Sequence, residues 1–167
     1  MRNGTVGLGA LALMALTAAS GEAAQERGPV TDLPMPRYVS LNAEEGNARR
    51  GPGTSHRIDW VFRHRSMPLR VTAEFEHWRR VEDSEGEGGW MHYALLSGVR
   101  TVRVEAERVT LRLQPDSRAP EVAHLERGVI ARLLECRIGW CRLNAGGERG
   151  WAERAGLGGV DPGEVFD

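Results

Sequence analysis

The chain repeats itself, and this repeat constrains the fold more than any other feature of the sequence. Residues 47–96 can be laid over residues 109–157 with shifts of only one residue between the matching blocks. The matching blocks are N-A-R-R-G-P with T-L-R-L-Q-P, M-P-L-R-V with V-I-A-R-L, H-W-R-R-V with G-W-C-R-L, and Gly89-Trp90 with Gly150-Trp151. A period of about 62 residues exceeds that of solenoid repeats, so each copy is expected to be a complete small domain.

The residue pattern within each copy is that of a β protein. Met67, Leu69, Val71 and Ala73 alternate with other residues, and residues 129–133 behave similarly apart from Ile130. Such alternation indicates half-buried strands. Polar, glycine-rich turns separate the strands, and closing so small a sheet into a barrel would protect its edges. We therefore predict an all-β chain of two small barrels in tandem.

The N-terminus has the pattern of a secretory signal peptide. Arg2 precedes an uncharged, mostly apolar stretch over residues 4–19, and small residues follow up to a possible cleavage point before Ala24. A membrane anchor is the alternative, but spanning a bilayer takes about 20 predominantly apolar residues. We predict a signal peptide over 1–23, a periplasmic or secreted protein, and no stable membrane anchor after cleavage.

The remaining boundaries follow from the repeat. We expect an extended lead-in over 24–36, which carries three prolines, and a short acidic tail over 159–167. The two domains are predicted over 37–97 and 104–158, joined by a linker over 98–103 that is short enough to hold them in contact.

These residues resemble a known family. The N-A-R-R-G-P block at 47–52, the W-R-R-V block at 78–81 and the two G-W pairs are similar to bacterial SH3-like (SH3b) domains. Residues 37–41 and 58–62 resemble an exported proteobacterial subgroup of unknown function, whereas Leu113-Gln114 departs from the family pattern in the second copy. The resemblance implies SH3-like barrels of five or six strands, and modules that bind or target, often toward peptidoglycan or envelope proteins. A fold alone does not fix the function.

The two cysteines, Cys136 and Cys141, are predicted to form a structural disulfide. If they close a four-residue hairpin loop, they face each other across two strands, and an exported protein can keep them oxidised. The first copy places Glu74 and Arg79 at the same two positions, and opposite charges suit facing sites. The alternative is a redox or metal pair, but the C-x4-C spacing is no redox motif and zinc takes four ligands.

The five tryptophans divide into repeated and unique ones. Trp78 matches Trp140 and Trp90 matches Trp151, which favours packing in or near the core over ligand contact. Trp60 has no counterpart, because Val122 or Ala123 falls at its position. With Asp59 beside it, Trp60 is either a surface anchor for a peptide or sugar or a contact between the domains.

The sequence shows no sign of catalysis, of a cofactor or of a metal site. It has no G-x-S-x-G motif and no phosphate-binding loop, and its histidines lack ligand spacing. A net charge of −1 and the predicted export argue against nucleic acid as a partner.

We therefore predict a non-enzymatic binding module that holds a peptide or peptidoglycan-type ligand in a groove of the first copy. The candidate residues of this groove are Arg50, Asp59, Trp60, Trp78, Trp90 and His92. The alternative is a structural adaptor that binds an envelope protein, or a second copy of itself, through the barrel faces.

Overall fold

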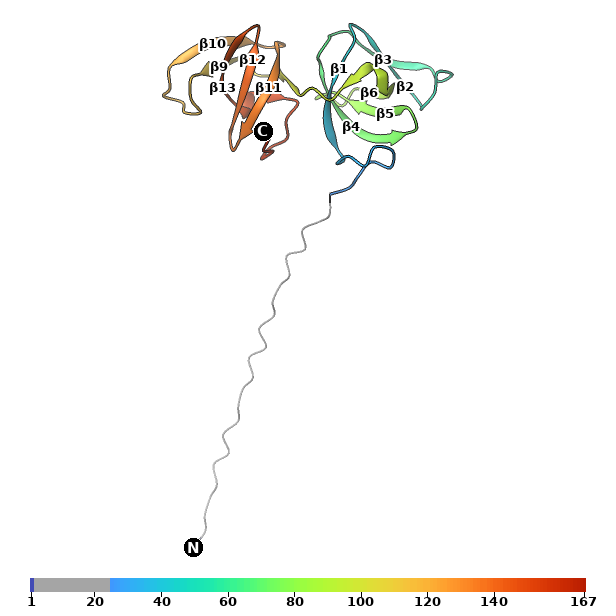
Figure 1. Cartoon of the computed structure of the whole chain (residues 1–167). Coiled ribbons are helices and arrows are strands. Elements are labelled where there is room, and N and C mark those ends of the chain that lie inside the picture. Colours follow the sequence, from blue (N-terminus) through green and yellow to red (C-terminus); the bar gives the residue numbers. More distant parts are fainter. Residues whose placement is uncertain (2–24) are drawn as a thin grey trace.

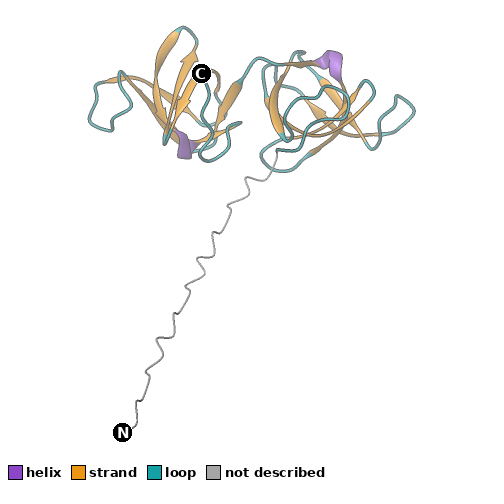
Figure 2. Cartoon of the chain, turned by 60° about the horizontal axis from the view of Figure 1, so that its bottom comes forward, coloured by secondary structure: helices purple, strands orange, loops and turns teal. Residues whose placement is uncertain are grey.

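The chain folds into two small antiparallel β-barrels that lie side by side (Figure 1). This arrangement comes from a computed structural model that describes Met1 and residues 25–167. The all-β prediction is confirmed, and among the described residues the two 3-10 turns η1 and η2 are the only helical elements (Figure 2). The predicted signal peptide lies outside the described residues. Within residues 25–167 no helix has the length and apolar character needed to cross a bilayer.

The first barrel is a seven-stranded sheet in the order β3-β2-β6-β5-β4-β1-β7. Its elements are β1 (Arg37–Leu41), β2 (Gly46–Arg49), β3 (Ile58–Phe62), β4 (Pro68–Phe75), β5 (Trp78–Glu82), β6 (Gly88–His92), η1 (Tyr93–Leu95) and β7 (Leu96–Ser97). Strand β3 pairs only with β2 and therefore forms one edge of the sheet.

The second barrel repeats the first, strand for strand, in the order β10-β9-β13-β12-β11-β8-β14. Its elements are β8 (Thr101–Val104), β9 (Arg108–Arg112), β10 (Glu121–Glu126), β11 (Ile130–Arg137), β12 (Trp140–Ala145), β13 (Glu148–Glu153), η2 (Arg154–Gly156) and β14 (Leu157–Gly158). Strand β8 begins inside the segment 98–103 that was expected to be a linker. It is part of the sheet because Thr101 and Val102 are buried against the second core.

Each barrel has its own core, as two complete domains require. Leu69, Val71 and Val81 are wholly buried in the first barrel, and Val102, Leu111 and Leu143 in the second. The alternation that predicted strand β4 therefore points Leu69 and Val71 inward, and a register shift after Val71 leaves Ala73 only partly buried. Ile130 broke that alternation in the second copy, and the structure explains why: its side chain packs against the core of the first barrel.

The two barrels are in direct contact. Thr101 Oγ1 donates a hydrogen bond to the carbonyl oxygen of Ser66 at 2.7 Å, and the Tyr38 hydroxyl lies 3.4 Å from Asp161 Oδ1. Burial, followed by the nearby Asp161 carboxylate, raises the pKa of Tyr38. At this junction Gly159 has a φ of +94°, and a Cβ there would lie 2.7 Å from the Cβ of Pro68.

The segments that flank the barrels fold back onto them. The lead-in differs from the expected extended form, because Arg27 and Pro34 form a β-bridge and the amide of Gly28 donates to the carbonyl of Leu33. At the other end, Phe166 forms a β-bridge with Cys136 on β11. Thus the lead-in covers β4 of the first barrel near Glu74, and the tail covers the corresponding part of β11 in the second.

Candidate functional site

The outer face of the β5–β6 hairpin presents three of the six predicted site residues. Trp78 stands opposite His92 and Arg80 opposite Trp90. Their neighbours along the strands, Val81 and Met91, point into the core and are almost wholly buried. Because successive side chains of a strand point to opposite faces, Trp78, Trp90 and His92 lie on the outside.

Trp78 and His92 belong to a larger cluster of rings. The rings of Trp78 and His92 meet edge to face with centroids 5.6 Å apart, and Tyr93 stacks on His92 at 4.9 Å. The ring centroids of His77 and His92 are 5.9 Å apart, and Phe75, on β4, stands opposite Trp78, on β5. Phe75 is 51% exposed and Tyr93 50% exposed. We call Phe75, His77, Trp78, His92 and Tyr93 the aromatic patch.

The aromatic patch belongs to the first barrel alone. The strand registers place Arg137, Trp140 and Glu153 where the first barrel has Phe75, Trp78 and His92. Arg154, the first residue of η2, takes the place of Tyr93. Only the tryptophan is shared, so the copies have the same scaffold and different surfaces.

Sequence reasoning missed Phe75, His77 and Tyr93. Phe75 ends β4, His77 lies in the β4–β5 turn and Tyr93 follows β6, so the three come together only when the hairpins are paired. A signal was present nonetheless, because the aligned positions of the second copy carry arginine and glycine instead of rings.

Trp60 lies elsewhere, on the edge strand β3. It stands opposite the wholly buried Ala48 and remains 40% exposed. Its ring meets that of Phe62 edge to face, with ring centroids 6.4 Å apart. The register assigns Ala123 as its counterpart in the second barrel. Strand β3 is on the side of the first barrel that faces away from the second (Figure 1), which does not suit a contact between the domains.

Arg50 and Asp59 form an ion pair near Trp60. Arg50 Nε lies 3.1 Å from Asp59 Oδ2, and Arg57 Nε lies 2.6 Å from Asp59 Oδ1. The hydrogen bond from Arg57, supported by Arg50, lowers the pKa of Asp59. The structure thus divides the six predicted residues between two surfaces: Trp78, Trp90 and His92 on the β5–β6 hairpin, and Arg50, Asp59 and Trp60 around β3.

One arginine that recurs in both copies has a structural role. Arg49 donates hydrogen bonds to the carbonyl oxygens of Thr54 and His56, at 3.0 and 2.7 Å. Arg112, at the same position of the second barrel, donates to the carbonyl of Ala119 at 2.8 Å. Each arginine therefore fixes the long loop that precedes the edge strand, which explains why it recurs.

The predicted disulfide is present. Cys136 and Cys141 are directly opposite on β11 and β12, with Cα atoms 4.1 Å apart. The backbone of Cys136 pairs with Phe166 on its other side, which makes the cysteines a non-hydrogen-bonded pair, as predicted. The strands continue through Arg137 and Trp140, so the turn contains two residues and is tighter than the four-residue loop expected.

The corresponding positions in the first barrel hold the predicted ion pair. Glu74 and Arg79 face each other, with Arg79 Nε 3.5 Å from Glu74 Oε1, and both residues are buried. The same carboxylate accepts hydrogen bonds from the Thr31 hydroxyl at 2.7 Å and from Arg37 at 2.7 Å. Burial alone would raise the pKa of Glu74, but the hydrogen bonds from Thr31, Arg37 and Val30 outweigh it and lower the pKa to about 2.

The described residues contain no group of three or more histidine, cysteine or acidic side chains placed to hold a metal ion.

Comparison with known proteins identifies the class to which this architecture belongs. The sequence model described as "Bacterial SH3 domain" matches residues 42–98 and 105–159, one match for each barrel. The chain therefore belongs to the bacterial SH3 domain family and carries two of its domains in tandem. Domains of this family are generally non-catalytic modules that bind peptidoglycan or peptides.

Two solved structures from Trichomonas vaginalis, NlpC2 and NlpC1, show a distant likeness. Each is 12% identical to the chain with a TM-score of 0.35, and the matches cover 73% and 78% of this chain. The chain spans about half of theirs, 47% and 48% respectively. A comparison with curated protein sequences finds no match.

Proposed function

We propose that the protein is an exported, non-catalytic binding module of the cell envelope that recognises a peptide or peptidoglycan-type ligand. The observation that carries this proposal is the aromatic patch: five rings gathered on the outer face of the first barrel, with Phe75 and Tyr93 about half exposed. Large exposed rings are the residues most enriched at binding surfaces. Family membership and the disulfide, which persists in oxidising compartments, support the proposal.

The patch offers both apolar area and a hydrogen-bond donor. The rings of Trp78, Phe75 and Tyr93 can cover the apolar face of a sugar ring or of a peptide side chain. His92 Nδ1 accepts a hydrogen bond from the amide of Ala94 at 3.2 Å, which places the proton of the neutral ring on Nε2. That N–H can donate to a ligand carbonyl or hydroxyl. The guanidinium carbon of Arg79 lies 5.9 Å from the centre of the Tyr93 ring, within reach of a cation–π contact.

Sedimentation with purified peptidoglycan tests this function. We expect the protein to pellet, and the double variant Phe75→Ala/Tyr93→Ala to bind at least about tenfold more weakly, since two exposed anchors are removed. The matched control is Val99→Ala/Leu113→Ala, which removes two exposed apolar side chains elsewhere and should pellet like the parent. If the Phe75/Tyr93 variant pellets unchanged while its unfolding midpoint is normal, the patch is not the binding surface.

The edge strand β3 supports the second candidate function, a structural adaptor. Its outer side is unpaired within the described sheet, and Ile58 and Trp60 are both exposed on it. An extended strand of a partner protein, or β3 of a second copy, could add to this edge.

A variant of Trp60 distinguishes the two candidate functions. Trp60→Ala should reduce self-association in sedimentation equilibrium, or capture of an envelope protein, only if the protein is an adaptor. A protein that never pellets with peptidoglycan, yet self-associates through Trp60, would favour the adaptor over the proposed function.

A further inference from the structure

The second barrel has a cleft of its own, on the side where the first barrel has the aromatic patch. Two adjoining hollows of about 660 and 370 Å³ share Trp140, Glu153 and Ala155 in their walls. In the first barrel the corresponding positions are filled by rings, namely Trp78, His92 and their neighbours.

The larger hollow is apolar and its wall is fixed in place. Leu157, Val160, Pro162 and Ala155 line it. Arg154, only 8% exposed, donates to the carbonyl oxygens of Asp161 and Arg137 at 3.0 and 2.7 Å, and also to that of Glu164. This buried guanidinium holds the tail against η2, so the tail forms a preformed wall of the cleft.

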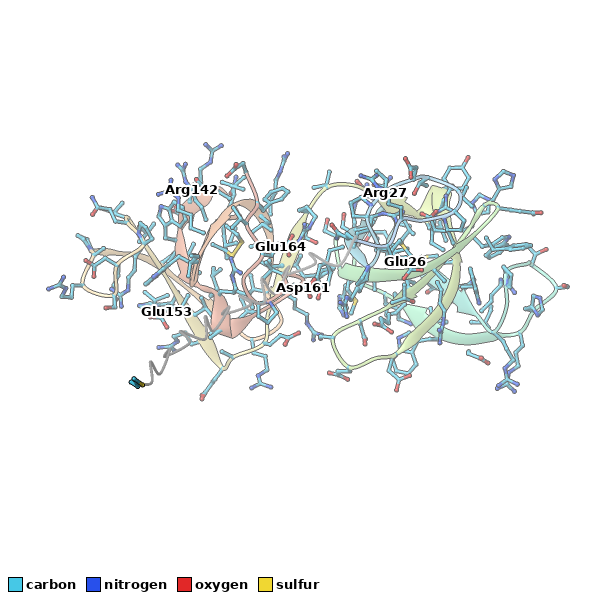
Figure 3. The ribbon with its side chains drawn as sticks, turned by 90° about the horizontal axis from the view of Figure 1, so that it is seen from below. Glu26, Arg27, Arg142, Glu153, Asp161 and Glu164 are labelled. Carbon is cyan, nitrogen blue, oxygen red and sulfur yellow. A yellow bond between two sulfur atoms is a disulfide. The ribbon has the colours of Figure 1, made fainter. Side chains whose placement is uncertain are left out.

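An exposed carboxylate, that of Glu153, lies in the wall that the two hollows share. Glu153, labelled in Figure 3, is exposed and stands opposite Trp140 across the β12–β13 hairpin. It takes part in no ion pair among the residues that the structure describes. Of the arginines near the cleft, Arg108 pairs with Glu126 at 3.1 Å, Arg112 with Glu121 at 3.3 Å, and Arg137, which stands opposite Trp140, with Glu135 at 2.6 Å. Arg154 is occupied by three backbone carbonyls.

We propose that this cleft binds a lysine-type side chain of an extended peptide, that is, an aliphatic stem ending in an ammonium group. The apolar wall of Leu157, Val160 and Pro162 suits the stem. The ammonium group would be placed between the face of the Trp140 ring and the Glu153 carboxylate, two groups that both attract a cation. This site is separate from the aromatic patch and does not rest on the proposed function.

Nuclear magnetic resonance with ¹⁵N-labelled full chain tests the proposal. The probe is the peptide acetyl-Ala-Lys-Ala-amide, and its match is the same peptide with norleucine, which keeps the stem and lacks the charge. We expect the lysine peptide to shift the indole N–H of Trp140 and the amides of residues 153–163. The norleucine peptide should bind about fivefold more weakly, the difference that an exposed ion pair makes.

Glu153→Gln should lower the affinity for the lysine peptide toward that of the norleucine peptide, because only the attraction of the Trp140 ring for the ammonium group remains. Glu148→Gln, which removes an exposed carboxylate from the other end of β13, should change nothing. Equal affinities of the two peptides, or shifts confined to the first barrel, would overturn the proposal. The Phe75→Ala/Tyr93→Ala variant should bind the lysine peptide normally. The proposed lysine site and the proposed ligand binding by the aromatic patch can therefore be disproved independently.

Discussion

At the scale of single residues, Glu74 organises more of the first barrel than any other charged group described above. Its carboxylate accepts from the backbone amides of Val30 and Thr31, from the Thr31 hydroxyl and from Arg37, and it faces Arg79. A buried charge is costly unless it is paired and hydrogen-bonded, and this one is both. The same contacts attach the lead-in to β4.

The low pKa of Glu74 makes the stability of the protein depend on pH. Because the pKa falls from 4.5 to about 2 on folding, the ionised carboxylate stabilises the fold above pH 4.5, and this contribution disappears as the pH falls toward 2. The loss should be on the order of 3 kcal/mol in the free energy of unfolding, measured by urea titration at several pH values.

Glu74→Gln tests the origin of this pH dependence. We expect the variant to be about 3 kcal/mol less stable at pH 7, since two arginines lose their partner, and to lose less stability on acidification than the parent. Glu87→Gln, which removes an exposed carboxylate, should keep the parent profile. A Glu74→Gln variant with the full acid dependence would show that another carboxylate is responsible.

Residue-scale prediction succeeded where the partners were close in sequence. The cysteine pair and the Glu74–Arg79 pair were both predicted, because a hairpin register relates residues only five apart. The bonds from Thr31 to Glu74 could not be predicted, since they join segments 43 residues apart and need the lead-in to fold back.

At the scale of elements, the two barrels hold the same hairpin together in different ways. The β11–β12 hairpin has a disulfide where the β4–β5 hairpin has an ion pair. Replacing both cysteines by alanine should cost about 2 kcal/mol, the value expected for closing so short a loop. Urea unfolding measures it, and dithiothreitol should destabilise the parent by a similar amount and leave the alanine variant unchanged.

The aromatic patch shows the limit of prediction for elements. Trp78, Trp90 and His92 were predicted as site residues and lie on one hairpin, but Trp60 was expected with them and lies on the edge strand. Beside Trp60, a bulge between Ala48 and Arg49 changes the register of β2 with β3. A register shift of this kind is not visible in the spacing of side chains.

At the scale of the whole molecule, the repeat was sufficient to predict two barrels, but not where the second begins. The boundary fell inside the expected linker because the link is shorter than the alignment suggested: only residues 98–100 separate β7 from β8. So short a link places the barrels in contact and brings Thr101, Ile130 and Gly159 of the second barrel to the first.

Gly159 should control this contact. Gly159→Ala places a methyl group 2.7 Å from both Pro68 and the carbonyl oxygen of Thr101, so we expect the barrels to separate. Small-angle X-ray scattering should show a larger radius of gyration. Gly163→Ala is the control: its φ of +79° costs about 1 kcal/mol of strain, but nothing lies within 4 Å of the added methyl. Unchanged dimensions in the Gly159 variant would contradict the prediction.

The lead-in and the tail also meet at the seam between the barrels. Gln25, Asp161 and Gly163 line one cavity there, and Asp161 and Glu164 lie between the two barrels (Figure 3). The beginning of the lead-in and the beginning of the tail therefore lie at the same cavity. Pro162 and Gly163 line this cavity and also the larger hollow of the second barrel, so a ligand that displaces the tail at the cleft would also change the contact between the barrels.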